Sequence, residues 1–214
     1  MLRILKNKKI SEICNIEDLN IVLNQFKTIH IDLGTGNGKY IYDLAVKDPC
    51  NLYIGIEPTA SNLYEYSKKA NKNKLNNLIY IISSIENLDD DLNGMADKVY
   101  INFPWGSLLE VIVKDLPELL NKISLLGKSK SEFHFTFAYS AIHEPVEIEK
   151  RNLPILTEEY LLTNIKEIYL KAGLSVESCI NITPQEVNKF GTLWARKLFL
   201  GKSRDVYKII SIKI

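Results

Sequence analysis

The chain has 214 residues, of which 46% are hydrophobic and 25% are charged, and its net charge is +1. This length suits one domain with a sizeable core, and a second full domain would be cramped. No apolar run approaches the ~20 residues that a membrane-spanning helix needs. The first ten residues also lack the apolar stretch of a signal peptide, so we expect a cytoplasmic protein without a membrane partner.

Cysteine usage argues against disulfides and metal. Cys14, Cys50 and Cys179 lie far apart in the sequence and form no C-x-x-C pair. Reduced, mostly structural thiols are therefore expected, and no metal site is predicted.

Positive charge is clustered although the net charge is nearly neutral. A dedicated nucleic-acid-binding domain is often strongly basic, so RNA binding by this chain would have to depend on local patches. The clusters are Lys68, Lys69, Lys72 and Lys74; Lys150 and Arg151; and Arg196, Lys197, Lys202 and Arg204. Most charge runs are simply solvated faces, and the clusters alone do not decide between the two interpretations.

Strand and helix signals alternate along the chain. Apolar runs predict strands at residues 28–33, 52–56, 78–82, 98–103 and 132–138. Helices are expected at 39–47 and 60–72, and two more are expected to begin at the caps Asp115 and Thr157 and to end at Gly127 and Gly173. Strands at 174–180, 193–200 and 206–212 complete the chain.

This alternation predicts an α/β fold. Strands separated by helices form a mainly parallel sheet that is covered by helices on both faces. No helix separates the last two strands, so we expect them to pair antiparallel. The predicted architecture is one domain over residues 1–214, with a short N-terminal extension over about 1–20 and a seven-stranded sheet that contains one antiparallel strand.

A glycine-rich loop joins the first expected strand to the first helix. Its sequence, Asp32-Leu33-Gly34-Thr35-Gly36-Asn37-Gly38, has glycines that let the backbone turn sharply and approach a ligand. Lys39 stands where a dinucleotide fingerprint has its last glycine, and no Lys-Ser/Thr pair closes a phosphate loop. The loop resembles motif I of methyltransferases. By analogy, the fold is that of a Rossmann-like class I methyltransferase.

Acidic residues near this loop suit S-adenosylmethionine. Asp32 suits the cationic methionine end of the cofactor, and Glu57 ends the second strand, where an acid typically accepts hydrogen bonds from ribose hydroxyls. Ser84 and Glu86 follow the third strand and are candidates for contacting the adenine. The cofactor-binding residues predicted from this constellation are Asp32, Gly34, Gly36, Gly38, Glu57, Ser84 and Glu86. A purely structural turn or another nucleotide is the alternative.

The fourth strand ends in Asn102-Phe103-Pro104-Trp105-Gly106-Ser107, where class I methyltransferases face the transferring methyl group. Phe103 replaces the first proline of the N/D-P-P-Y/F/W motif, so Asn102 is not plainly in that motif's role. Trp105 can stack on a base, and Trp194 precedes basic residues, an arrangement used in RNA recognition. Core filling is the alternative for either tryptophan.

The sequence resembles the 16S rRNA (adenine(1408)-N(1))-methyltransferases that confer aminoglycoside resistance, over nearly its whole length. The similarity is carried by Met1–Leu5, His30–Gly36, Tyr53–Ile56, Phe103–Gly106 with Leu108–Glu110, Lys150-Arg151 with Leu153-Pro154, and Leu193-Trp194-Ala195. The pair formed by F-P-W-G and L-W-A is fairly specific.

The resemblance implies a role for each group of residues. Asp32, Glu57, Glu86, Phe103, Ser107 and Thr192 would hold the cofactor; Trp105 and Trp194 would clamp the flipped adenine; and Lys68, Lys69, Arg151, Arg196, Lys197, Lys202 and Arg204 would contact rRNA. The implied partner is the 16S rRNA of the small ribosomal subunit, and the protein is expected to be a monomer. The alternatives are methylation of another RNA or a small molecule, and a non-catalytic, cofactor-sensing RNA-binding domain.

The implied reaction needs no general base, because adenine N1 holds a free lone pair at neutral pH. The sequence accordingly has no obvious His–Asp pairing. His30, His134 and His143 lie in or near expected strands, and we interpret them as structural.

Overall fold

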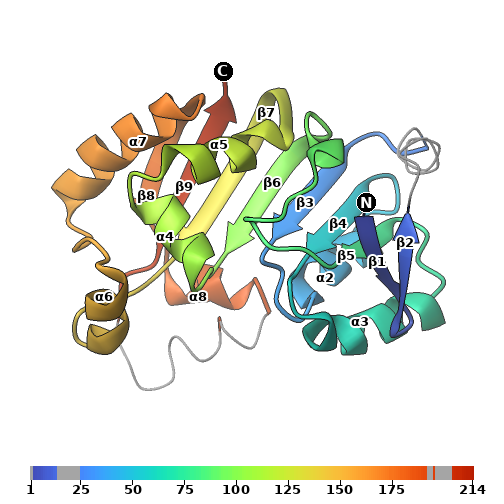
Figure 1. Cartoon of the computed structure of the whole chain (residues 1–214). Coiled ribbons are helices and arrows are strands. Elements are labelled where there is room, and N and C mark those ends of the chain that lie inside the picture. Colours follow the sequence, from blue (N-terminus) through green and yellow to red (C-terminus); the bar gives the residue numbers. More distant parts are fainter. Residues whose placement is uncertain (1, 14–24, 192–194, 196–203) are drawn as a thin grey trace.

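The computed structural model of the chain describes residues 2–13, 25–191, 195 and 204–214. The described strands form one sheet of nine in the order β2-β1-β5-β4-β3-β6-β7-β9-β8 (Figure 1). The strands are β1 (Leu2–Lys6), β2 (Lys9–Ile13), β3 (Ile29–Leu33), β4 (Leu52–Ile56), β5 (Leu78–Ile81), β6 (Ala96–Asn102), β7 (Gly127–Phe137), β8 (Leu174–Asn181) and β9 (Tyr207–Lys213).

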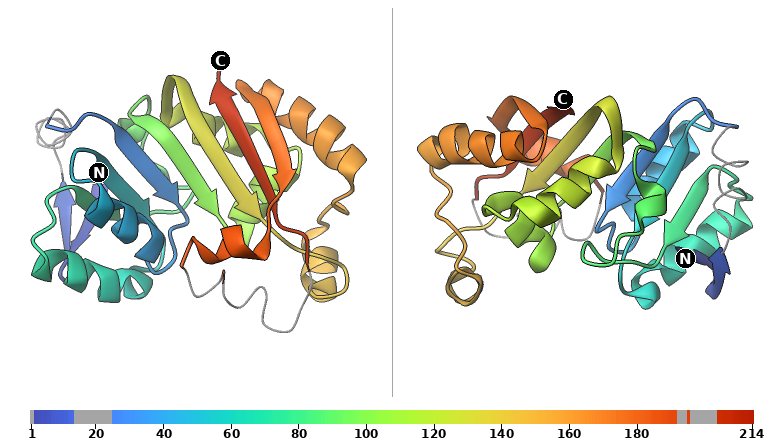
Figure 2. Two further views of the ribbon diagram at one scale, coloured as in Figure 1. Left: turned by 180° about the vertical axis from the view of Figure 1, so that it is seen from behind. Right: turned by 45° about the horizontal axis from the view of Figure 1, so that its top comes forward.

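Helices cover both faces of the sheet, as the sequence predicts. Two lie on one face, α2 (Lys39–Lys47) and α3 (Ala60–Lys72), and three lie on the other, α4 (Ser107–Val113), α5 (Pro117–Leu125) and α7 (Ile165–Lys171) (Figures 1 and 2). A π-helical turn, Tyr160–Asn164, leads into α7, and the chain also has a short 3-10 turn, Asp90–Leu92. The short helices α6 (Pro145–Arg151) and α8 (Pro184–Asn188) follow the ends of β7 and β8. None of the described helices is long and apolar enough to cross a membrane.

Of the two helix N-caps that the sequence predicts, one is confirmed and one is wrong. Thr157 caps its helix as expected, because its hydroxyl accepts a hydrogen bond from the backbone N–H of Tyr160 at 3.1 Å. The helix expected to be capped by Asp115 instead has Leu116 at its N-cap and Pro117 in its first turn. Proline is favoured there because the first helical N–H has no partner within the helix.

The predicted parallel sheet is confirmed, but the strand count and the last pairing are not. Strands β5, β4, β3, β6 and β7 run parallel, and β9 is inserted antiparallel between β7 and β8. The sequence predicts that the last strand pairs with residues 193–200. Of these only Ala195 is described, and it is helical and buried.

The expected N-terminal extension adds two further strands. Residues 2–13 form a hairpin whose first strand pairs antiparallel with β5, with Ile4 opposite Ile81. The hairpin turns at Asn7 and Lys8, which both have left-handed φ angles. Lys6, Lys8 and Lys9 hide the strand pattern in the sequence. Charged lysines are typical of edge strands, because they discourage pairing with another chain.

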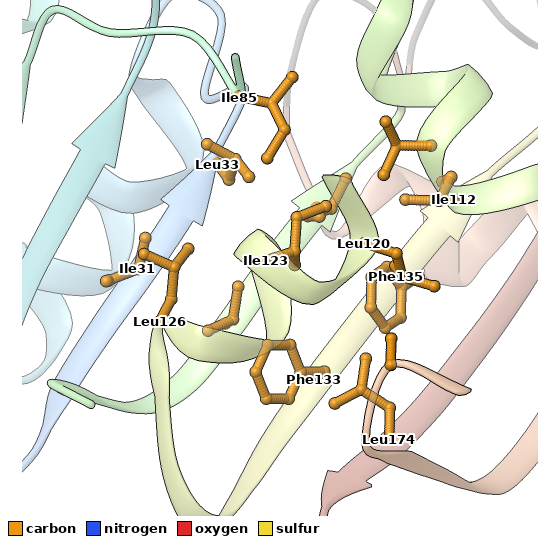
Figure 3. Close-up of a cluster of buried hydrophobic side chains, with 14 of the residues drawn as sticks. Ile31, Leu33, Ile85, Ile112, Leu120, Ile123, Leu126, Phe133, Phe135 and Leu174 are labelled. Atoms are coloured by element: carbon orange, nitrogen blue, oxygen red, sulfur yellow. The ribbon is translucent and has the colours of Figure 1, made fainter. Parts of the chain in front are cut away.

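The main core lies between the sheet and helices α4, α5 and α7. Figure 3 shows Phe133 and Phe135 of β7 beneath Leu120 and Ile123 of α5, and all four side chains are fully buried. Each such side chain contributes about 1.5–3 kcal/mol of burial free energy. This packing fixes β3, β6 and β7 relative to one another, so the loops that leave their carboxyl ends have a rigid base.

A glycine at the start of α2 is required by packing. Gly38 has a φ of 75°, and a Cβ atom built on it would lie 2.5 Å from the ring of Tyr80. The Tyr80 hydroxyl donates a hydrogen bond to the Gly38 carbonyl at 2.8 Å. The close approach of this ring therefore demands glycine at this position.

We predict that Gly38→Ala lowers the unfolding free energy by about 1–3 kcal/mol more than Gly94→Ala does. Both glycines have left-handed φ angles, but a Cβ atom on Gly94 meets nothing within 4 Å. Chemical denaturation of the two variants measures the difference, which isolates the clash with Tyr80. Equal losses of stability would show that the ring moves aside at no cost.

Candidate functional site

A cleft of about 490 Å³ lies at the carboxyl ends of β3, β4, β5 and β6. Its wall is formed by residues 33–37, 57, 58, 62, 83–86, 102–105, 107 and 108. Ligands of open α/β sheets bind at this edge, because the loops that follow parallel strands all emerge there. Seven of the predicted cofactor residues line the cleft, namely Gly34, Gly36, Glu57, Ser84, Glu86, Phe103 and Ser107.

The glycine-rich loop brings its backbone to the cleft wall. Gly34 and Gly36 have φ angles of 73° and 59°, a region that residues with a Cβ atom rarely adopt. A Cβ atom on Gly34 would also lie 2.6 Å from the side chain of Leu108 at the start of α4. The loop can therefore pack against α4 only because this residue is glycine.

Glu57 is held as a fixed hydrogen-bond acceptor at the end of β4. Its carboxylate accepts hydrogen bonds from the Gly36 N–H at 3.2 Å, the Thr59 N–H at 3.3 Å and the Asn62 amide at 3.0 Å. Only 8% of the residue is exposed. A carboxylate that accepts this many hydrogen bonds is held in one orientation, which suits hydroxyl groups of a ligand.

Asp32 and Gly38 lie behind the cleft wall instead of on it. Asp32 is 2% exposed, and it accepts hydrogen bonds from the Thr35 hydroxyl at 2.5 Å and the Asn102 amide at 3.4 Å. Burial raises the pKa of Asp32 to about 7, although these two hydrogen bonds oppose the shift. The acid that the sequence assigns to direct cofactor contact thus joins the loop after β3 to the end of β6.

The acceptor side of the cleft depends on a strained turn after β6. Phe103 has a φ of 51°, and its N–H donates to the Thr136 carbonyl at 2.7 Å. The turn places Phe103, Pro104 and Trp105 on the cleft wall. Trp105 is 40% exposed, so core filling does not explain this tryptophan.

A second polar group lines the same cleft. Hydrogen bonds from the hydroxyls of Ser107 and Ser84 lower the pKa of Glu86. Ser84 and Glu86 lie in the loop after β5, Ser107 is the first residue of α4, and all three line the cleft. The sequence predicts each of them, and the structure brings them together.

Two asparagines of the cleft are absent from the sequence-based predictions. Asn62 orients Glu57, and Asn102 lines the cleft with a buried Oδ1 atom that receives no hydrogen bond from the described part of the chain. A buried acceptor without a partner is costly, so its position on a cleft wall indicates a ligand donor. The only sequence signal is the place of Asn102 at the end of the fourth strand.

The residues expected to contact RNA have different surroundings. Lys68 and Lys69 are exposed on α3, where Lys69 pairs with Glu65 at 2.7 Å. Arg151 pairs with Glu110 at 2.7 Å and Glu147 at 2.9 Å. The predicted residues Thr192, Trp194, Arg196, Lys197 and Lys202 lie outside the described residues.

Arg204 does not lie on the RNA-contacting surface that the sequence predicts. Its side chain is 5% exposed and forms an ion pair with Glu144 at 2.8 Å. Removing one partner from a buried pair leaves an uncompensated charge. Arg204 therefore ties the start of the final segment to the N-cap of α6, and it is not an open contact for phosphate.

His30 and His134 have polar partners within the fold. His30 contacts the Thr28 hydroxyl at 2.9 Å, and burial, reinforced by Lys98, lowers its pKa to about 4. His134 contacts Glu132 at 3.0 Å on the same strand, β7. Neither lines the cleft. Within the described ranges, no three His, Cys, Asp or Glu side chains gather as a metal site.

The raised pKa of Asp32 predicts a pH dependence of stability. The folded state keeps the proton up to about pH 7, whereas the unfolded chain releases it near the ordinary value of 3.8. The stability that this group contributes is therefore present below about pH 4 and is lost as the pH rises to 7.

We predict that Asp32→Asn flattens the fall of the melting temperature between about pH 4 and pH 7, because an amide does not titrate. Thermal melts across this range measure the slope, and Asp90→Asn, at an exposed position, is the control that should keep the wild-type slope. A wild-type slope in Asp32→Asn would mean that Asp32 is ionised throughout.

Comparison with known proteins identifies the family. The model of the NpmA family, 16S rRNA (adenine(1408)-N(1))-methyltransferase, matches residues 3–213. The enzyme of that name from Escherichia coli is 36% identical over 211 residues, covering 96% of each chain.

Two solved structures are also similar. A tryptophan-to-alanine mutant of the same enzyme from Catenulisporales acidiphilia, with cosubstrate SAM, is 25% identical with a TM-score of 0.89 and covers 100% of this chain and 97% of that one. The aminoglycoside resistance methyltransferase NpmB1 is 26% identical with a TM-score of 0.82, and each chain is fully covered. The chain therefore belongs to the family of 16S rRNA (adenine(1408)-N(1))-methyltransferases.

Proposed function

We propose that this chain transfers a methyl group from S-adenosylmethionine to N1 of adenine 1408 in 16S rRNA, within the small ribosomal subunit, and thereby gives aminoglycoside resistance. The observation that carries the proposal is the exposed Trp105 on the wall of a cleft whose polar groups suit the cofactor. The family membership supports the choice of substrate. The enzyme would act as a monomer in the cytoplasm, where it meets the subunit.

The residues of the cleft fit S-adenosylmethionine. Glu57 offers a fixed acceptor for ribose hydroxyls, and the unpartnered Oδ1 of Asn102 offers an acceptor for the methionine ammonium. Asp32, directly behind Asn102, would add its negative charge near that ammonium. Ser84, Glu86 and Ser107 would hold the adenine side. When bound, the cofactor supplies an electrophilic methyl group on a sulfonium.

The protein's task on the acceptor side is orientation. Adenine N1 brings its own lone pair, so the cleft needs no residue to remove a proton, and none of its described lining residues is a histidine or lysine. Trp105 would stack on the flipped base, and Trp194 would cover the other face, as the family resemblance implies. Two indoles also favour the positive charge that develops on the ring, by ~0.5–2 kcal/mol.

Docking on rRNA would use local clusters of cations. Lys68, Lys69 and Lys72 of α3 line one groove with Lys8 of the β1–β2 turn and with Tyr64. The groove combines positive charge with an aromatic ring, and this combination suits a phosphate backbone. Lys197, Lys202 and Arg196 would add contacts near Trp194, whereas the burial of Arg204 removes it from this set.

We predict that Trp105→Ala lowers the single-turnover rate of methylation of purified small subunits by ~100-fold or more. Lost stacking of ~1–3 kcal/mol and misorientation of the base both contribute. Trp105→Phe should keep part of the activity, because it retains an aromatic face. Labelled methyl transfer with mapping of the modified base measures the rate and the site. Near-normal turnover by folded Trp105→Ala, or methylation elsewhere, would contradict the proposal.

We predict that Lys68→Glu weakens subunit binding and lowers the slope of log affinity against log salt by about 1. The matched control is Lys47→Glu, an equal charge change at the exposed carboxyl end of α2, which returns to the edge of the sheet opposite the cleft. Titrations at several salt concentrations compare the two variants. Equal effects of both variants would indicate that net charge, and not the α3 groove, governs docking.

A further inference from the structure

The connection between β5 and β6 is a long loop that carries two residues of the cleft wall. It spans residues 82–95, and within it the chain forms only the 3-10 turn Asp90–Leu92. Ser84 and Glu86 lie near its start and line the cleft. Loops of this length are uncommon in compact domains, and those that carry a binding site need a rigid support.

Helix α5 supports the end of this loop that leads into β6. The backbone N–H groups of Gly94, Met95 and Ala96 donate hydrogen bonds to carbonyls at the carboxyl end of α5. The acceptors are Leu125 for Gly94, at 2.7 Å, and Leu126 for the other two, at 3.0 and 2.9 Å. Because α5 packs its apolar side against the sheet in the main core (Figure 3), it is a fixed point for the loop.

One side chain of α5 reaches the other end of the loop, next to the cleft. The ammonium group of Lys122 donates a hydrogen bond to the backbone carbonyl of Glu86 at 3.1 Å. Hydrogen bonds from Ser107 and Ser84 lower the pKa of the Glu86 carboxyl most, and the charge of Lys122 lowers it further. Lys122 itself does not line the cleft. It therefore acts on Glu86 from outside, through the backbone and through its charge.

Glu86 needs such support because burial does not hold it. Glu86 is exposed, whereas the preceding residue, Ile85, is 3% exposed and belongs to the main core. An exposed glutamate has many rotamers, and ordering it when a ligand binds costs conformational entropy. With Ile85 buried and the Glu86 carbonyl held by Lys122, the backbone that carries the carboxylate is fixed on both sides before a ligand arrives.

We propose that Lys122 is a positioning residue for cofactor binding, because it holds Glu86 at the cleft wall as an ionised acceptor on the adenine side of S-adenosylmethionine. An ionised carboxylate only accepts hydrogen bonds, so it suits a donor group of the ligand. Without Lys122, the start of the loop loses its tie to α5 and the carboxylate loses a neighbouring positive charge. The role of Glu86 toward the cofactor rests on the proposed function, whereas the contact of Lys122 with the loop does not.

The test is calorimetric titration with S-adenosylhomocysteine, which needs no rRNA. Lys122→Met keeps the apolar stem of the side chain but removes the donor and the charge. We predict that it weakens binding by about 3–10-fold, the range expected for one hydrogen bond. Lys122→Arg keeps a donor and a charge and should bind within about 2-fold of the wild type.

Two controls separate this role from a general effect of charge or stability. Lys171→Met removes an equal charge from α7, where Lys171 pairs with Asp115 at 2.7 Å and not with the loop, and it should bind as the wild type does. Both lysines are exposed, so both variants should melt near the wild-type temperature. In a Glu86→Ala background, adding Lys122→Met should cost less than about 2-fold, because the carboxylate on which Lys122 acts is gone.

Four results would overturn the role of Lys122. These are a loss of affinity below 3-fold in Lys122→Met, a loss that persists in Lys122→Arg, an equal loss in Lys171→Met, and an undiminished loss in the Glu86→Ala background. Failure of the wild-type enzyme to bind S-adenosylhomocysteine would overturn it together with the proposed cofactor site. Failure of methylation with normal binding would count against the proposed substrate alone.

Discussion

The site depends on one buried carboxylate between two strands. Asp32 lies near the end of β3, and it accepts hydrogen bonds from Thr35 in the glycine-rich loop and from Asn102 at the end of β6. The cofactor loop and the acceptor turn are therefore tied to the same side chain. Burial makes ionisation of Asp32 costly and brings its pKa to about 7, so the charge is poised to form when a cation approaches. An ammonium group near Asn102 would supply such a cation. The same acid would thus organise the loops of the cleft and strengthen the electrostatic field around a bound cofactor.

The sequence predicts the parts of the fold that depend on continuous patterns. Buried parallel strands are almost wholly apolar, and the runs at β3 and β4 are therefore easy to recognise. The hairpin at residues 2–13 is missed because its lysines interrupt the pattern at the edge of the sheet. The helical state of Ala195 is also missed, since the apolar residues around it read equally well as a strand. Pattern reasoning fails where a short element is held mainly by tertiary contacts.

The sequence likewise predicts some residues of the candidate site and misplaces or misses others. Gly34, Glu57 and Trp105 are predicted because each has a chemical signature at a strand end, and all three line the cleft. Asp32 has the same kind of chemical signature, but its side chain lies behind the cleft wall. Spacing along the sequence does not show which way a side chain points, so the sequence does not predict this placement. Arg204 is misassigned for the opposite reason. A cation in a basic run looks like a surface residue until its partner, Glu144, is found far earlier in the chain. Asn62 gives no signal, because its hydrogen bond to Glu57 and its place on the cleft wall appear only in the folded chain.

The proposed methyl transfer explains why the acceptor side of the site depends on aromatic packing. A nucleophile with a free lone pair and an electrophile with a good leaving group need little proton transfer, so rate depends on alignment. Alignment of a flat base is best achieved by flat side chains. The exposed indole of Trp105 would be held by the strained turn at Phe103, and that turn by the ring of Phe190. Because Phe103 also forms the cleft wall, a packing defect at Phe190 would reach both reactants without touching either. In such an enzyme, the rate depends on aromatic residues that align the base, and also on the packing that holds those residues in place.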